Sequence, residues 1–114
     1  MLVLSSGFHE LIEPVLAREG VTVPVLANRV AEGPDGWQVH WRDEAVCEVC
    51  GEECKRRGLP AGDVIYVGDG FSDRCAALAA GRRFAVRGLA RYLDGLGEPY
   101  EPFSDFRDIG RALA

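Results

Sequence analysis

The stretch from Val64 to Val67 places the strongest constraint on the fold. Its four residues, VIYV, are β-branched or aromatic, as expected for a strand covered by helices on both faces. Gly68-Asp69-Gly70 follows, and Ser72 is a suitable N-cap for an alanine-rich helix that ends near Ala80. Because a helix and not a returning strand follows the turn, this pattern favours a parallel α/β sheet.

Other segments extend this pattern. We expect a strand over Leu2 to Ser5, a helix whose apolar face recurs from Phe8 to Leu16, a short strand at Phe84 to Val86 and a terminal helix over Ser104 to Leu113. Strands that alternate with helices predict a three-layer, Rossmann-like α/β fold with a mainly parallel sheet.

A small β-hairpin is expected near residues 23–42. Trp37, Val39 and Trp41 alternate with polar residues, and the Gly33-Pro34-Asp35-Gly36 turn separates them from a preceding apolar run. With no linker or repeat in 114 residues, we expect one domain over positions 1–114.

Charge and hydropathy exclude several classes of partner. Thirteen Lys and Arg against eighteen Asp and Glu give a net charge of -5, which disfavours nucleic acid and acidic membranes. No apolar run approaches the roughly 20 residues of a membrane span. The first residues lack the basic start of a signal peptide, so we expect a cytoplasmic protein.

Two aspartates leave the end of the most buried strand. Asp69 and Asp73 could share one Mg²⁺, with Gly68 and Gly70 letting the backbone approach a ligand. Magnesium held by few carboxylates and by substrate phosphate is typical of phosphoryl transfer, although Asp-Gly is also a common hairpin turn.

Two further segments could bind phosphate. Ser5, Ser6 and Gly7 lie between a predicted strand and a helix, where hydroxyls and backbone N–H groups bind anions, although a serine there is often only a helix cap. Lys55 is the only lysine of the chain and could oppose negative charge in a transition state.

Three of the four cysteines lie close together in the sequence. Cys47, Cys50 and Cys54 have spacings compatible with zinc, and Cys75 or His40 could complete a tetrahedral site. One and a half CxxC pairs do not define a closed site, so we expect substoichiometric zinc or none, and idle thiols are the alternative.

In this order, SSGF, CGEECK and GDGFSD resemble motifs of the haloacid dehalogenase superfamily of phosphatases. The resemblance covers nearly the whole chain and is strongest to the phosphoserine phosphatase-like branch, particularly its 2-hydroxy-3-keto-5-methylthiopentenyl-1-phosphate phosphatases. It implies that Ser5 and Lys55 bind phosphate and that Asp69 and Asp73 bind Mg²⁺.

The family's DxDxT motif, whose first aspartate is the nucleophile, does not occur in this sequence. We therefore expect a core that lacks its N-terminal strand and cap, and whose magnesium binding is weak. The resemblance implies hydrolysis of a small phosphorylated metabolite. The alternative is a non-catalytic phosphate- or metal-binding module. We also expect a homo-oligomer, or a partner that supplies the missing strand.

Overall fold

The computed structural model describes residues 1–114 as two compact units, Met1–Val46 and Cys47–Ala114. Each unit contains one three-stranded sheet, in the orders β1-β2-β3 and β4-β5-β6. The chain is thus mixed α/β, as predicted. The prediction of a single domain stays a prediction.

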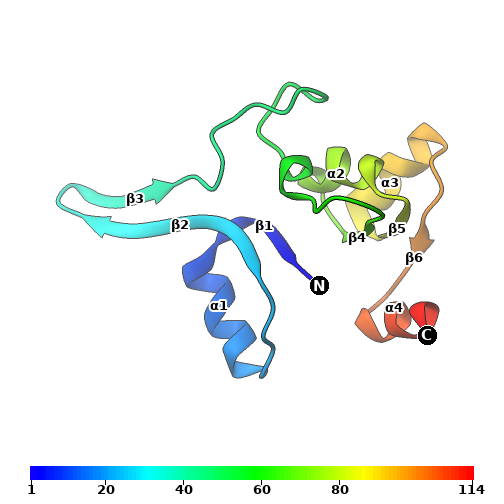
Figure 1. Ribbon diagram of the computed structural model, residues 1–114, viewed down its shortest axis with the longest axis horizontal. Coiled ribbons are helices and arrows are strands. Elements are labelled where there is room, and N and C mark those ends of the chain that lie inside the picture. Colours follow the sequence, from blue (N-terminus) through cyan, green and yellow to red (C-terminus); the bar gives the residue numbers. More distant parts are fainter. The chain divides into compact units, whose positions relative to one another are not determined.

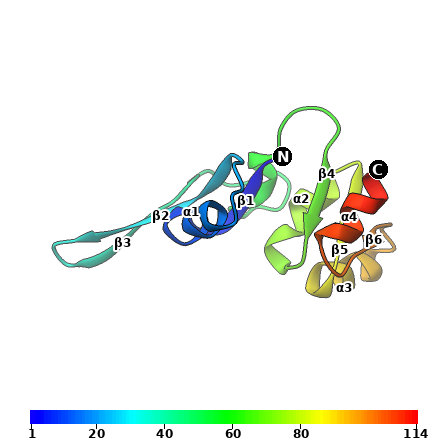
Figure 2. The same cartoon turned by 90° about the horizontal axis from the view of Figure 1, so that it is seen from below.

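The first unit is a mixed sheet with one helix. β1 (Val3–Phe8) pairs in parallel with β2 (Val25–Gly33), which pairs in antiparallel with β3 (Gly36–His40). The antiparallel pair confirms the predicted hairpin. Helix α1 (His9–Arg18) lies beside β2, and the outer part of the hairpin projects beyond it (Figures 1 and 2).

The second unit contains the all-parallel sheet and three α-helices. Its strands are β4 (Ile65–Gly68), β5 (Arg82–Ala85) and β6 (Glu101–Pro102), and every neighbouring pair is parallel. The helices are α2 (Arg74–Ala79), α3 (Arg87–Leu96) and α4 (Phe106–Leu113), and two 3₁₀ turns cover Lys55–Gly58 and Phe71–Asp73. In Figure 1, α2 and α3 lie above β4 and β5, and α4 lies below them.

The core of this unit lies between the sheet and the first two helices. Leu89 and Leu93, four residues apart on α3, are fully buried and belong to the same core cluster as Tyr66 of β4 and Ala76 and Ala77 of α2. The small alanine side chains let α2 approach the sheet closely. The strand expected at Phe84 to Val86 overlaps β5, but no element was predicted directly after it, so α3 was missed.

Two expected boundaries differ from the structure. β1 continues through Ser5 to Phe8, so no serine caps α1. Ser72 lies inside the 3₁₀ turn Phe71–Asp73 and does not cap a helix. The turn begins before Ser72 because the Asp73 side chain accepts a hydrogen bond from the Gly70 N–H. None of the helices is both long and apolar enough to cross a membrane.

Candidate active site

The loop after β4 is closed by a buried aspartate. Asp73 is 4% exposed, and its Oδ2 accepts hydrogen bonds from the backbone N–H groups of Asp69 (3.1 Å) and Gly70 (2.9 Å). The side chain therefore folds back over the loop that precedes it. This contact holds the Asp69 backbone in one place at the end of the strand.

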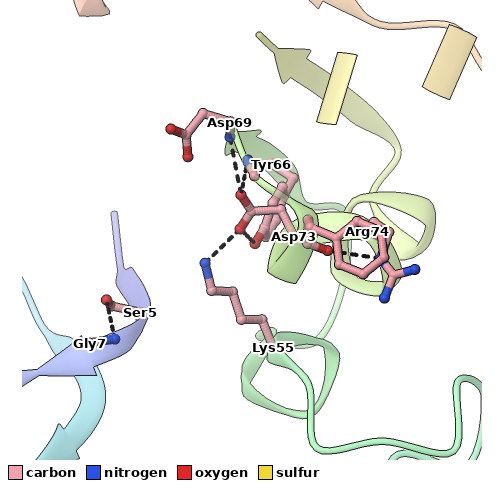
Figure 3. A network of polar contacts seen from close by, with 9 residues as sticks. Ser5, Gly7, Lys55, Tyr66, Asp69, Asp73 and Arg74 are labelled. Atoms are coloured by element: carbon pink, nitrogen blue, oxygen red, sulfur yellow. Dashed lines mark hydrogen bonds and ion pairs between the residues drawn. The ribbon is translucent and has the colours of Figure 1, made fainter. Parts of the chain in front are cut away.

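The other oxygen of the same carboxylate binds two side chains. Asp73 Oδ1 accepts from Lys55 Nζ at 2.6 Å and from the Tyr66 hydroxyl at 2.7 Å (Figure 3). Each carboxylate oxygen thus receives two donors, which is about its full capacity. A metal ion could bind Asp73 only by displacing one of them.

The protonation states suit this network. Burial alone would raise the pKa of Asp73, but hydrogen bonds from Lys55, the Gly70 N–H and Tyr66 outweigh it, so the pKa lies below 3.8. Burial, and then the bond to Asp73, raise the pKa of Tyr66 far above 10.0. At neutral pH Asp73 is an anion and Tyr66 a protonated donor.

Gly68 makes room for the buried carboxylate. A Cβ atom there would lie 2.8 Å from Asp73 Cγ and 2.8 Å from Asp73 Oδ2, well inside van der Waals contact. Gly70 is less restricted, since its nearest neighbour would be Asp73 Oδ2 at 3.8 Å. Of the two predicted loop glycines, Gly68 is therefore the one that the site requires.

Asp69 has a different environment from Asp73. Its side chain is 60% exposed, and Arg87 Nη1 lies 3.5 Å from Asp69 Oδ2. The Asp69 carbonyl accepts from the Leu89 N–H at 3.2 Å, which ties the loop to α3. Arg87 has a φ of 54°, uncommon for a residue with a side chain. Asp69 is thus the accessible carboxylate of the loop.

The predicted phosphate-binding serines lie in the first unit. Within β1, Ser5 Oγ accepts from the Gly7 N–H at 2.9 Å (Figure 3). The pairing of β1 with β2 is irregular between Leu4 and Phe8. Asn28, which is buried, donates to the Ser6 carbonyl at 3.1 Å. Because Ser5 Oγ is the acceptor in its bond to Gly7, its O–H remains able to donate to a ligand.

The four cysteines form one group in the second unit. Their sulfur atoms all lie within 4.8 Å of one another, and the fourth member is Cys75. All four are free thiols. N–H groups of Cys50 and Val49 hydrogen-bond the sulfur of Cys47 and lower the pKa of its thiol to about 6.

Sequence reasoning missed two residues near the candidate site. Tyr66 was taken only as a strand residue, although its alternation along β4 puts it on the same face as Gly68. Arg87 had no signal in the sequence because its proximity to Asp69 depends on how α3 packs.

These contacts define a class of site before any comparison. A parallel strand ends in a loop that presents one exposed carboxylate, and a lysine from a distant segment is fixed beside that loop by a buried aspartate. This arrangement suits the binding of an anionic ligand together with a metal ion.

Comparison with known proteins points to phosphatases. No protein-family model matches the chain. Two curated proteins of Microcystis aeruginosa, one of them from strain NIES-843 / IAM M-2473, are each 30% identical to it over 118 residues. Both are named 2-hydroxy-3-keto-5-methylthiopentenyl-1-phosphate phosphatase. The matches cover 98% of this chain but 55% of each relative, so the chain spans about half their length. They support a distant relationship with haloacid dehalogenase-type phosphatases.

Proposed function

We propose that this chain carries the phosphate- and metal-binding part of a haloacid dehalogenase-type phosphatase, which hydrolyses a small phosphate monoester with Mg²⁺. The observation that carries the proposal is the Lys55–Asp73 pair at the end of β4, 2.6 Å apart. It fixes a cation beside a loop that also presents Asp69. The names of the two Microcystis relatives support the same activity.

In this proposal each residue of the site has one role. Lys55 binds a phosphate oxygen and opposes the negative charge that develops during transfer. Asp73 positions Lys55 and the loop, because four donors already occupy its carboxylate. Asp69 is the accessible oxygen ligand for Mg²⁺. Arg87, whose Nη1 lies 3.5 Å from Asp69 Oδ2, places a positive charge beside that carboxylate.

The donor set fits magnesium only in part. Mg²⁺ binds proteins through one or two carboxylates and completes its shell with water and substrate phosphate. Asp69 supplies one such carboxylate, so the proposal implies weak binding without phosphate. When bound, the ion would neutralise charge on the phosphoryl oxygens.

The fold of the second unit is compatible with this proposal. An all-parallel sheet with helices around it is compatible with a Rossmann-like core. In the first unit, the Ser5 hydroxyl and the Ser6-Gly7 backbone are the proposed phosphate ligands. A cytoplasmic location, which the sequence predicts, is part of the proposal.

A chimera tests the activity directly. Because the sequence has no DxDxT motif, this chain should replace the region that it matches in one of the Microcystis relatives. We expect Mg²⁺-dependent turnover of phosphate monoesters, and a drop of about a hundredfold or more for Lys55→Met and for Asp69→Asn, since each removes charge stabilisation.

The control is Asp63→Asn, which changes the same functional group at an exposed position before β4 and should leave turnover unchanged. A folded chimera without turnover would contradict the phosphatase assignment. If it still bound orthophosphate through Lys55, the alternative of a non-catalytic phosphate-binding module would replace that assignment.

We also propose that another strand pairs with this chain. β1 lies at the edge of its sheet and β4 at the edge of the other, so each strand leaves one row of backbone groups without a strand partner in its own sheet. In addition, Trp37 of β3 is 74% exposed, so the first unit leaves an aromatic side chain uncovered. Sedimentation at micromolar concentration should show dimers or larger species, whereas a stable, cooperatively unfolding monomer would rule this out.

A further inference from the structure

The four cysteine sulfurs are spaced like the ligands of one tetrahedral ion. All lie within 4.8 Å of one another, and Cys47 Sγ is 3.8 Å from Cys75 Sγ. Zn–S bonds of about 2.3 Å in a regular tetrahedron put neighbouring sulfurs about 3.8 Å apart. A disulfide would need about 2.05 Å. The group therefore has the size of a single-metal site.

The backbone around Cys47 is arranged for a negatively charged sulfur. The N–H groups of Cys50 and Val49 point at Cys47 Sγ, and the turn is closed by the Gly51 N–H, which donates to the Cys47 carbonyl at 2.9 Å. Gly51 has a φ of +73°, which glycine adopts without strain. N–H donors to sulfur stabilise a metal-bound thiolate.

A positive charge lies beside Cys75. Arg56 Nη1 is 3.7 Å from Cys75 Sγ and 3.5 Å from the Cys75 carbonyl oxygen. Four thiolates around a divalent ion carry a net charge of about -2, and a neighbouring guanidinium offsets part of it.

The segment that carries three of the cysteines has almost no apolar core. From Cys47 to Gly58, Cys47 is the one buried residue, and Val49 is 66% exposed. Hydrophobic burial therefore cannot hold these twelve residues in one conformation. Small segments of this kind are commonly held by a structural metal.

We propose that Cys47, Cys50, Cys54 and Cys75 bind one structural zinc ion that fastens residues 47–54 to α2. Four thiolates in a tetrahedron favour zinc, and four protein ligands leave no open position for catalysis. The ion itself would take no part in the proposed phosphoryl transfer. The expectation of little zinc rested on an uncertain fourth ligand, which the structure supplies as Cys75.

The proposed zinc would also position the candidate active site. Cys54 directly precedes Lys55, and Cys75 follows Asp73 by two residues. The ion would thus join the two segments whose side chains form the 2.6 Å ion pair. Loss of the metal should loosen Lys55 relative to Asp73 while β5 and α3 stay intact.

Metal analysis of the chain purified under reducing conditions and reconstituted with Zn²⁺ tests the site. We expect one zinc per chain, and intense thiolate-to-metal absorption when Co²⁺ replaces it. Cys50→Ser and Cys54→Ser should lose the metal. Glu53→Gln, an exposed neighbour that does not belong to the group, should keep it.

The opposite results are equally clear. The proposal would be overturned if the reduced chain took up no zinc or if both serine variants retained it. It would also be overturned if the site preferred iron or if the cysteines formed a disulfide instead. Hydrogen exchange tests the positioning role: a chelator should speed exchange of the Asp69 and Gly70 amides, which bond Asp73, but not of α3 amides beyond Leu89, whose own N–H bonds the Asp69 carbonyl. Unchanged exchange at Asp69 and Gly70 would refute that role.

Discussion

Replacing Asp73 with asparagine is expected to lower the free energy of unfolding of residues 47–114 by about 3 to 5 kcal/mol. The substitution removes the charge that pairs with the Lys55 ammonium, whose side chain is only 12% exposed, and turns an amide N–H₂ group toward donors. A loss of this size is a large part of a typical domain's stability. Asp63→Asn, at an exposed position, should change stability by less than about 0.5 kcal/mol.

Urea unfolding followed by far-UV circular dichroism measures this loss. Tryptophan fluorescence does not suit it, because Trp37 and Trp41 belong to the first unit. Exchange of the Asp69 and Gly70 amides gives a local readout, since both donate to Asp73. Lys55→Met combined with Asp73→Asn should cost less than the sum of the single changes.

The same network makes stability depend on pH. Since the pKa of Asp73 is lower in the folded chain than its ordinary 3.8, its contribution is present above that value and is lost as pH falls below it. Asp73→Asn should remove this part of the acid dependence. An unchanged acid profile, or a stability loss no larger than that of Asp63→Asn, would contradict the structural role of Asp73.

Gly68→Ala is expected to lower the free energy of unfolding by about 1 to 3 kcal/mol, the usual cost of overpacking. Its Cβ would lie 2.8 Å from Asp73 Cγ, and the carboxylate cannot move away without giving up its four hydrogen bonds. In addition, Lys55 would lose its fixed position, so the chimera should lose turnover.

Gly70→Ala is the matched control. The nearest atom to its Cβ would be 3.8 Å away, and Gly70 has an extended backbone that alanine adopts freely. It should therefore be nearly neutral. In an Asp73→Ala background, Gly68→Ala should lose most of its effect, because the clashing carboxylate is gone. Equal costs for Gly68→Ala and Gly70→Ala would show that the carboxylate contact is not the cause.

Local sequence patterns account for the elements that were predicted correctly. The apolar run before Gly68 is a strand because its side chains suit a pleated, covered surface, and the turn at Gly33 to Gly36 joins two antiparallel strands. α3 escaped prediction because Arg, Gly and Asp dilute its apolar pattern, and only the burial of Leu89 and Leu93 marks its inner face.

The sequence by itself determined which chemical groups this protein has and where its strands meet its loops: one lysine, two aspartates after β4, and cysteines at metal-compatible spacing. Only the tertiary structure decided which of these groups are buried, which are exposed and which lie together. Asp73 turned inward to four donors while Asp69 stayed exposed, and Cys75 joined three cysteines that precede it by more than twenty positions. Burial and hydrogen bonding depend on which segments pack together, and spacing along the chain does not specify that.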